Sequence, residues 1–244
     1  MRVAGNVVQG NLGGNVIGVW LRNDGTTVEQ NQIVGGCGAQ TAVGILADDT
    51  FARIENNLVS GGGCQTNDTS TPRNIGVRIY DNDDQNEIDL HSNTIDGGGN
   101  AGICISVGVE WGVGPETPPT APKGIVRNNI MRAGICNTRS DFAEVQTASD
   151  PRLFENNDLD PTSSTLYLDE SITILGTAAA VNALTDVTAR NNLGAAPQFV
   201  SFPTNQHLQP GSACIGAGTP AGAPARDFEG KTRSTSHPTI GAYE

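Results

Sequence analysis

The sequence predicts an all-β chain built from stacked repeats of parallel strands, and three observations support this prediction. An asparagine stands two residues before an aliphatic residue at Asn6, Asn31 and Asn56, a constant step of 25 residues. A glycine followed by a β-branched residue recurs between these asparagines, and runs of glycine separate the segments. Self-similarity at a period of this length is typical of repeat proteins, in which one short unit stacks on the next.

The asparagine motif returns along the whole chain with looser spacing. Its members are Asn6, Asn31, Asn56, Asn93, Asn128, Asn157 and Asn191, and the later steps of 37, 35, 29 and 34 residues locate insertions. An inward asparagine at the corner of each coil can hydrogen-bond to the asparagines above and below it. We therefore expect an asparagine ladder, and we expect replacement of Asn56 by leucine to destabilise the fold.

The glycine motif predicts a second strand in each coil. It occurs at Ile17–Leu21, Val43–Ala47, Ile75–Ile79 and Ala101–Ile105. Aligning these four segments places Trp20, Leu46, Arg78 and Cys104 on one outer face of a sheet. The runs at 35–36, 61–63 and 97–99 are glycines that we expect in turns with unusual backbone angles.

Two or three strands of about five residues in a coil of about 25 residues fit a solenoid of parallel strands. We expect one domain, with about seven coils over residues 1–200 and a closing segment over 201–244 packed on them. Residues 177–184, rich in alanine, are expected to form a short helix, and 64–72, 81–87 and 110–122 are expected to be loop insertions. Because the first motif begins almost at Met1, we expect that an N-terminal cap and an export signal precede this chain.

The composition argues against two classes of partner. The chain has 244 residues, a formal net charge of −12, a pI near 4.5 and only two lysines, Lys123 and Lys231. Such a surface does not favour binding to nucleic-acid phosphates. No run of about 20 apolar residues is present, so no transmembrane segment is expected.

The five cysteines suggest disulfides between neighbouring coils. Cys37 and Cys64 both follow glycines and fall on the same corner of successive coils, about 4.8 Å apart, which suits a disulfide. A second pairing, Cys104 with Cys136, is the weaker expectation. Paired cysteines favour an exported protein, and the alternative is that all five are small buried residues in a reducing compartment.

The repeats and the tail together resemble a known group. The tail carries the segments 205–215, 227–230 and 240–244, with Arg233 between the last two. These resemble the closing segment of bacterial secreted or surface proteins of the choice-of-anchor type, which belong to the right-handed parallel β-helix (pectin-lyase-like) repeat proteins. The resemblance implies a right-handed parallel β-helix and an extracytoplasmic setting, and it does not imply a reaction.

Residues able to carry out chemistry are few. The carboxylate pairs Asp48–Asp49 and Asp83–Asp84 are more typical of turns than of a glycoside hydrolase, and the Gly-His-Gly and Arg-Ile-Lys signatures of that branch are absent. A polysaccharide lyase needs a base, for which the candidates are Lys123, Arg127 and Arg78.

Two further sets of residues are candidates for binding. Oxygen ligands are concentrated at Asp81, Asp83, Asp84 and Glu87, which suits Ca²⁺, although a solvated turn is the preferred interpretation; no other cofactor is expected. Trp20, Tyr80 and Trp111 are candidates for stacking on sugar rings.

These observations predict an extracellular or surface-attached protein with a structural or binding role toward carbohydrate or another cell surface. The alternative is a lyase acting on uronic-acid polysaccharides. The oligomeric state is left open.

Overall fold

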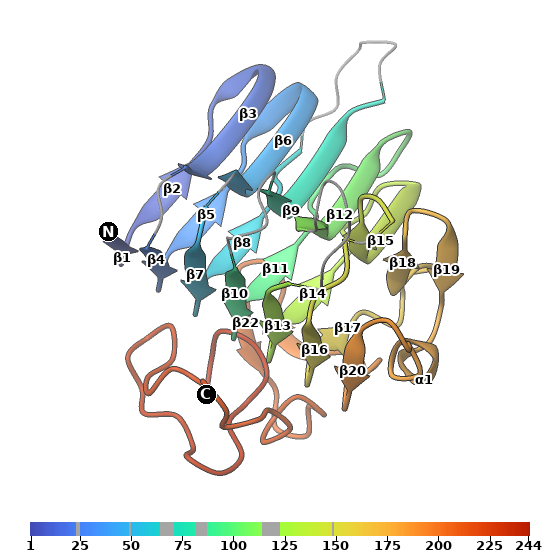
Figure 1. The fold of residues 1–244 in the computed structure, drawn as a ribbon. Helices are drawn as coiled ribbons and strands as arrows, with labels where there is room; N and C mark the ends of the chain where they lie inside the picture. Colours follow the sequence, from blue (N-terminus) through green and yellow to red (C-terminus); the bar gives the residue numbers. More distant parts are fainter. Residues whose placement is uncertain (23–24, 49, 64–70, 82–86, 114–122, 148) are drawn as a thin grey trace.

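The chain folds almost entirely into parallel β-sheets. The computed structural model describes the protein from Met1 to Glu244, except residues 23–24, 49, 64–70, 82–86, 114–122 and 148. Successive strands join three sheets in turn and then return to the first sheet one place further along, so strands three apart in sequence are neighbours (Figure 1). This confirms the all-β class and the parallel pairing, and none of these sheets closes on itself.

The strands of the three sheets follow one another in chain order. Sheet A contains β1 (Arg2–Ala4), β4 (Thr26–Glu29), β7 (Ala52–Glu55), β10 (Ile88–His91), β13 (Ile125–Arg127), β16 (Leu153–Glu155) and β20 (Thr188–Arg190). Sheet B contains β2 (Val7–Gln9), β5 (Gln32–Val34), β8 (Leu58–Ser60), β11 (Thr94–Asp96), β14 (Ile130–Arg132) and β17 (Asp158–Leu159). Sheet C contains β3 (Leu12–Leu21), β6 (Cys37–Asp48), β9 (Arg73–Asp81), β12 (Ile105–Val113), β15 (Thr138–Glu144), β18 (Tyr167–Asp169) and the antiparallel β19 (Thr173–Leu175).

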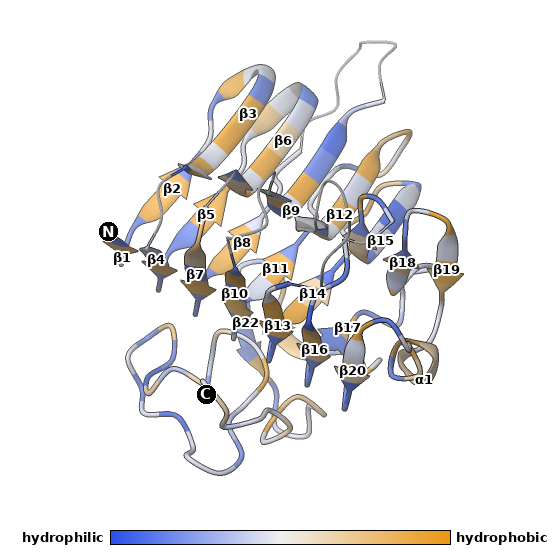
Figure 2. Ribbon diagram, in the orientation of Figure 1, coloured by the Kyte–Doolittle hydropathy of each residue, from blue (hydrophilic) through white to orange (hydrophobic). Residues whose placement is uncertain are grey.

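The core lies between the three sheets and is filled by the inward residues of their strands. Ile54 of sheet A, Ile33 of sheet B and Ile45 of sheet C are fully buried in one cluster. Figure 2 shows the apolar residues concentrated along the strands. Toward the C-terminal end the aliphatic residues give way to aromatic ones, and the ring of Phe142 stacks on Tyr167 at 4.8 Å between centroids. Apolar and polar residues alternate in the sequence because successive side chains of a strand point alternately into the core and to the outside.

A buried asparagine ladder holds the repeats together at the corner between sheets A and B. Its members are Asn6, Asn31, Asn57, Asn93, Asn129, Asn157 and Asn192. The backbone N–H and Nδ2 of Asn57 both donate to Oδ1 of Asn93, at 2.9 and 3.0 Å. Nδ2 of Asn57 also donates to the carbonyls of Val28 and Glu55, both at 2.9 Å. Every polar atom of the buried amide is thereby paired, which is the condition for burying it without penalty.

The sequence motif placed three ladder members one residue too early. Asn56, Asn128 and Asn191 stand just before the ladder and adopt the left-handed conformation, with φ of 52°, 55° and 55°. Asparagine tolerates that conformation better than most residues, so two neighbouring asparagines serve two purposes. The expectation that Asn56 belongs to the ladder is wrong, because its side chain points to the C-terminal segment instead.

The ladder ends at the single helix of the described residues, α1 (Ala178–Val181). Thr177 caps its N-terminus, as expected from the predicted helix over residues 177–184. At the other end, Oδ1 of Asn182 accepts from the backbone N–H and Nδ2 of Asn192, at 3.0 and 2.8 Å. Val181 is fully buried in the main core. The helix therefore supplies the last acceptor of the ladder and covers the end of the core. No helix in the described part of the chain has the length and apolarity needed to span a membrane.

The glycine motif was also misaligned in one repeat. Arg78 pairs in register with Glu110, so Val107, Gly108 and Val109 continue the series rather than Ala101, Gly102 and Ile103. Cys104 lies before β12 and not on the outer face beside Arg78. The misalignment arose because residues 100–104 are inserted at the corner between sheets B and C and imitate the motif.

After Gly194 the chain leaves the three sheets and packs against the corner between sheets A and B. This C-terminal segment, residues 195–244, contains the antiparallel pair β21 (Phe199–Ser201) and β22 (Asn205–Leu208) and is drawn from orange to red in Figure 1. Ile240 and Cys214 form a small core with Ile130 of β14. The buried Arg233 donates to Oδ1 of Asn56 at 2.8 Å. The left-handed residues of the corner thus anchor the segment to the repeats.

Candidate functional site

A long hollow of about 610 Å³ runs across successive repeats over the edge of sheet B. Backbone of the glycine turns forms its floor, the last residues of the sheet B strands form one side, and the turn between β21 and β22 forms part of the opposite side. We call this hollow the sheet B groove. At about 610 Å³ it has the size of a site for a small ligand or a segment of a polymer.

The floor consists of backbone because side chains do not fit there. Gly36, Gly62 and Gly98 stack in successive repeats with φ of +95°, +80° and +72°. A Cβ at Gly62 would lie 2.2 Å from the carbonyl oxygen of Gly36, and one at Gly98 would lie 2.1 Å from that of Gly62. Glycine is required on both steric and conformational grounds. The result is an even floor of peptide groups along the direction of stacking.

The side of the groove is a column of residues that occupy one register position in sheet B. Val34, Ser60, Asp96 and Arg132 pair in sequence across β5, β8, β11 and β14. Ser60 Oγ accepts from the backbone N–H of Gly62 at 3.2 Å, and Asp96 Oδ2 accepts from that of Gly98 at 3.1 Å. These contacts fix the glycine turns and at the same time hold the polar side chains at the edge of the groove.

Arg132 connects the column to the C-terminal segment. Its Nε donates to Asp160 Oδ2 at 3.0 Å, and its Nη1 lies 3.9 Å from Asp96 Oδ1. The guanidinium carbon lies 4.0 Å from the centroid of the Phe202 ring, a cation–π distance. Phe202 and Pro203 are the residues of the C-terminal segment that line the groove. Arg132 therefore contacts residues on both sides of the groove.

The Asp96 carboxyl titrates close to neutral pH. Burial raises its pKa to about 6, while Arg132 and the Gly98 N–H act in the opposite direction. The cation next to it is shared, because the shorter contact of Arg132 goes to Asp160. Asp96 is thus an acid whose charge is incompletely balanced inside a concave site, a combination found at functional sites more often than elsewhere.

The three residues considered for lyase chemistry are not brought together. Lys123 is buried just before β13. Arg127 of sheet A donates to the Ala221 carbonyl at 2.6 Å beneath the C-terminal segment. Arg78 of sheet C donates to Glu110 Oε1 at 2.9 Å. None of the three lines the sheet B groove.

The aromatic candidates are also dispersed. Trp111 is fully buried in the main core against Phe142, so it is not available to a ligand, and the prediction for this residue is wrong. Trp111 occupies the same register position on β12 as the inward residues Ala47 on β6 and Ile79 on β9. Trp20 is 53% exposed and donates to Asp48 Oδ2 at 3.2 Å, and Tyr80 is 42% exposed on the same outer face of sheet C, two strands away.

The calcium candidates lie mostly outside the described residues. Asp83 and Asp84 fall in the segment 82–86, and the side chain of Asp81 is not described either. Glu87 is exposed and pairs with Arg152 at 3.2 Å. No cluster of acidic, histidine or cysteine residues able to hold a metal is found within the described ranges.

Of the cysteine pairings, the structure describes the one between Cys104 and Cys136, which are joined by a disulfide. The bond ties residues inserted before β12 to the turn before β15. Cys64 lies outside the described residues, so its pairing with Cys37 stays a prediction. Cys214 is a buried thiol 3.2 Å from Asp158 Oδ2.

A second hollow of about 390 Å³ lies on the outer face of sheet C. Its acid Glu110 is held by both Arg73 and Arg78. Glu144 at its other end accepts from Tyr167 Oη at 2.5 Å, and burial raises the pKa of Glu144 to about 8. The acids of this hollow are therefore bound by protein groups, and the sheet B groove is the better candidate.

Sequence reasoning missed the residues that line the groove and the acid that binds its arginine: Asp96, Arg132, Asp160 and Phe202. A signal existed for the first three, because each stands three residues after a ladder asparagine, where the outward column of sheet B lies. Comparisons with protein-family models, with curated proteins and with solved structures found no match to this chain.

Proposed function

We propose that this protein is a right-handed parallel β-helix of about seven coils that acts outside the cell or on its surface and binds an extended carbohydrate chain in the sheet B groove. The strand order, in which three sheets are joined in turn, supports this architecture. The disulfide supports an oxidising compartment. The proposed role is binding rather than catalysis.

The observation that carries the proposal is the form and chemistry of the groove. Its direction follows the stacking of the repeats, so a linear polymer lying in it meets the same peptide floor at every step of about 4.8 Å. Ser60, Asp96 and Arg132 offer hydrogen bonds to hydroxyl groups at its side. Phe202 offers an aromatic ring, the usual partner of the apolar face of a sugar. A site with a few polar groups and an aromatic wall suits such a ligand.

The lyase alternative has no comparable support. Arg127 and Arg78 lie on different sheets, each with a protein contact in place of a ligand, and Lys123 is buried before β13. Incubation with uronic-acid polysaccharides tests it directly, since β-elimination yields an unsaturated product that absorbs ultraviolet light. We expect no such product. An absorbance increase that depends on Lys123 or Arg127 would restore the alternative.

Binding is tested by calorimetric titration of the protein with a panel of neutral, amino-sugar and uronate oligosaccharides. At least one of them should bind, and the variant Phe202→Ala should lose about tenfold or more in affinity for it. The matched control is Phe228→Ala, since Phe228 also lies in the C-terminal segment with one aromatic neighbour, Tyr243, but outside the groove. Failure of every oligosaccharide to bind, or equal losses in both variants, would contradict the proposal.

A further inference from the structure

The charges of the sheet B groove are unevenly balanced. Arg132 is the one basic residue among the described residues that line the groove, and it makes its hydrogen bond to Asp160. Asp160 also accepts from the backbone N–H and the hydroxyl of Thr162, at 2.9 and 2.8 Å. Asp160 is therefore well satisfied. Asp96 is the acid that lines the groove, and its contact with a basic residue is the longer one of Arg132, at 3.9 Å.

The two oxygens of Asp96 differ in what they bind. Oδ2 accepts from the Gly98 N–H, and Oδ1 has Arg132 Nη1 beyond hydrogen-bonding distance. The side chain lies at the wall of the groove and is 15% exposed. A donor group on a ligand in the groove can therefore reach an oxygen that lacks a hydrogen bond within the protein. A charged donor gives the stronger bond, because charge-assisted hydrogen bonds are about twice as strong as neutral ones.

The groove also disfavours anions. A carboxylate on a ligand would meet Asp96 without an uncommitted arginine or lysine among the described lining residues. The chain as a whole has a net charge of −12, which repels polyanions at long range. Electrostatic repulsion therefore disfavours uronic-acid polymers both in the groove and at long range.

We propose that the groove selects a glycan bearing protonated amines, that is, a polymer of amino sugars with free amino groups, and that Asp96 Oδ1 binds one ammonium group. This inference rests on the proposed function, since it requires that the groove hold a glycan. The floor and Phe202 contribute to binding any sugar chain, and Asp96 decides which chemical class binds best. Neutral N-acetylated chains rank second, and uronate chains rank last.

The test compares three oligosaccharides of equal length by calorimetric titration: chitosan hexamer with free amines, chitin hexamer with acetylated amines, and hexagalacturonate. At neutral pH and low salt, the unmodified protein should bind chitosan hexamer about tenfold more tightly than chitin hexamer, as expected for one charge-assisted hydrogen bond. The variant Asp96→Asn should bind both about equally while keeping its affinity for chitin hexamer. Asparagine keeps an acceptor for the Gly98 N–H, so the turn is preserved.

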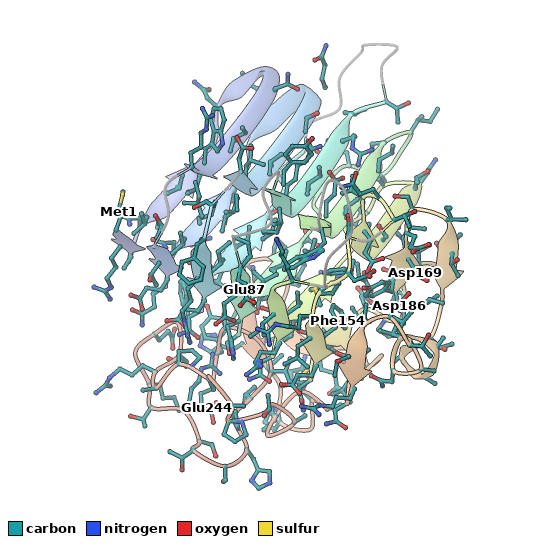
Figure 3. The ribbon with its side chains drawn as sticks, viewed as in Figure 1. Met1, Glu87, Phe154, Asp169, Asp186 and Glu244 are labelled. Carbon is teal, nitrogen blue, oxygen red and sulfur yellow. A yellow bond between two sulfur atoms is a disulfide. The ribbon has the colours of Figure 1, made fainter. Side chains whose placement is uncertain are left out.

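The control is Asp186→Asn, which removes one negative charge elsewhere. Asp186 also accepts a backbone N–H, that of Val187 at 2.9 Å, and lies at the far end of the molecule near α1 (Figure 3). This variant should keep the full preference for the amine. A second measurement needs no variant: the preference should fall as salt concentration rises, because salt screens the ion pair.

The outcomes separate the two proposals. Equal affinity of the unmodified protein for chitosan and chitin hexamers would overturn the inference and leave the proposed function standing. A preference that survives Asp96→Asn, or that is lost equally in Asp186→Asn, would also overturn it. Absence of binding to all three hexamers and to the wider panel would overturn both.

Discussion

Two columns of residues on the outer face of sheet B, two positions apart on the same strands, have different surroundings. Leu58, Thr94 and Ile130 are buried, and Ile240 and Gly241 of the C-terminal segment pack on this column. Ser60, Asp96 and Arg132 line an open groove. The C-terminal segment therefore divides one face of one sheet into a covered half and an open half. The repeats alone would leave the whole outer face of sheet B open. The non-repeating C-terminal segment covers one column of this face and leaves the other column open to a ligand.

The two halves share one support, the asparagine ladder, so breaking it should produce the largest effect. Asn93 directly precedes β11, which contributes Thr94 to the covered half and Asp96 to the open half. The variant Asn93→Leu leaves the N–H and Nδ2 of Asn57 without their acceptor and should lower the free energy of unfolding by about 3 to 5 kcal/mol. Urea denaturation measures this.

The control for that variant is Asn15→Leu, at an exposed position of β3 outside the ladder. It should change the free energy of unfolding by less than about 0.5 kcal/mol. If Asn93→Leu were no worse than Asn15→Leu, the ladder would not be what joins the repeats.

A change in the covered half alone should have the next largest effect. Ile130→Ala removes a buried side chain that packs on Cys214 and Ile240 and should cost about 2 to 4 kcal/mol. Hydrogen exchange should accelerate at 212–218 and 237–242, where the segment packs on Ile130. The control Ile135→Ala truncates an exposed residue of the groove and should leave exchange in those ranges unchanged. Unchanged exchange in Ile130→Ala would mean that this contact does not hold the segment down.

Lowering the pH should stabilise both halves of sheet B, and the effect should be larger in the covered half. Burial raises the pKa of Asp158, below the C-terminal segment, to about 7 and that of Asp96 in the groove to about 6. Because these folded-state pKa values lie above the unfolded one, the folded protein binds more protons, and the stability they contribute is lost as the pH rises through about 6 to 7.

Urea midpoints measured between about pH 5 and about pH 8 should therefore decrease as the pH rises. The decrease should be smaller in Asp158→Asn than in Asp96→Asn. A midpoint that rises over this interval would contradict the raised folded-state pKa values of these two acids.

The smallest effect is expected in the open half. Ser60→Ala removes the hydroxyl that accepts from the Gly62 N–H at the edge of the groove. Solvent can replace it there, so the loss in free energy of unfolding should be about 1 kcal/mol or less. A loss as large as that of Ile130→Ala would show that the open half is as structural as the covered half.

The fold class was accessible from the sequence because it depends on a repeated local pattern. The asparagines, the glycine turns and the period-two alternation each predict part of a parallel repeat. Their exact register was not accessible. Asn56 and Asn57 are identical in type, and only the left-handed backbone at Asn56 assigns the ladder position to Asn57.

The groove was less accessible because it depends on contacts between distant segments. Arg132 and Phe202 are 70 residues apart in numbering, and nothing in the pattern around either indicates that the guanidinium covers the ring. Trp111 illustrates the opposite error. The sequence predicts that this residue lies in the loop 110–122 and on the surface, whereas it belongs to β12 and its register with Ala47 and Ile79 places it in the core.

The division of sheet B is tested most directly by NMR of backbone amides during titration with chitosan hexamer, with chitin hexamer as the second ligand. Shifts are expected at Gly62 and Gly98, which form the floor of the groove, and no change is expected at Gly241, which packs against Ile130 in the covered half. Shifts at Gly241, or at Gly108 of sheet C, without shifts at Gly62 and Gly98 would contradict this division.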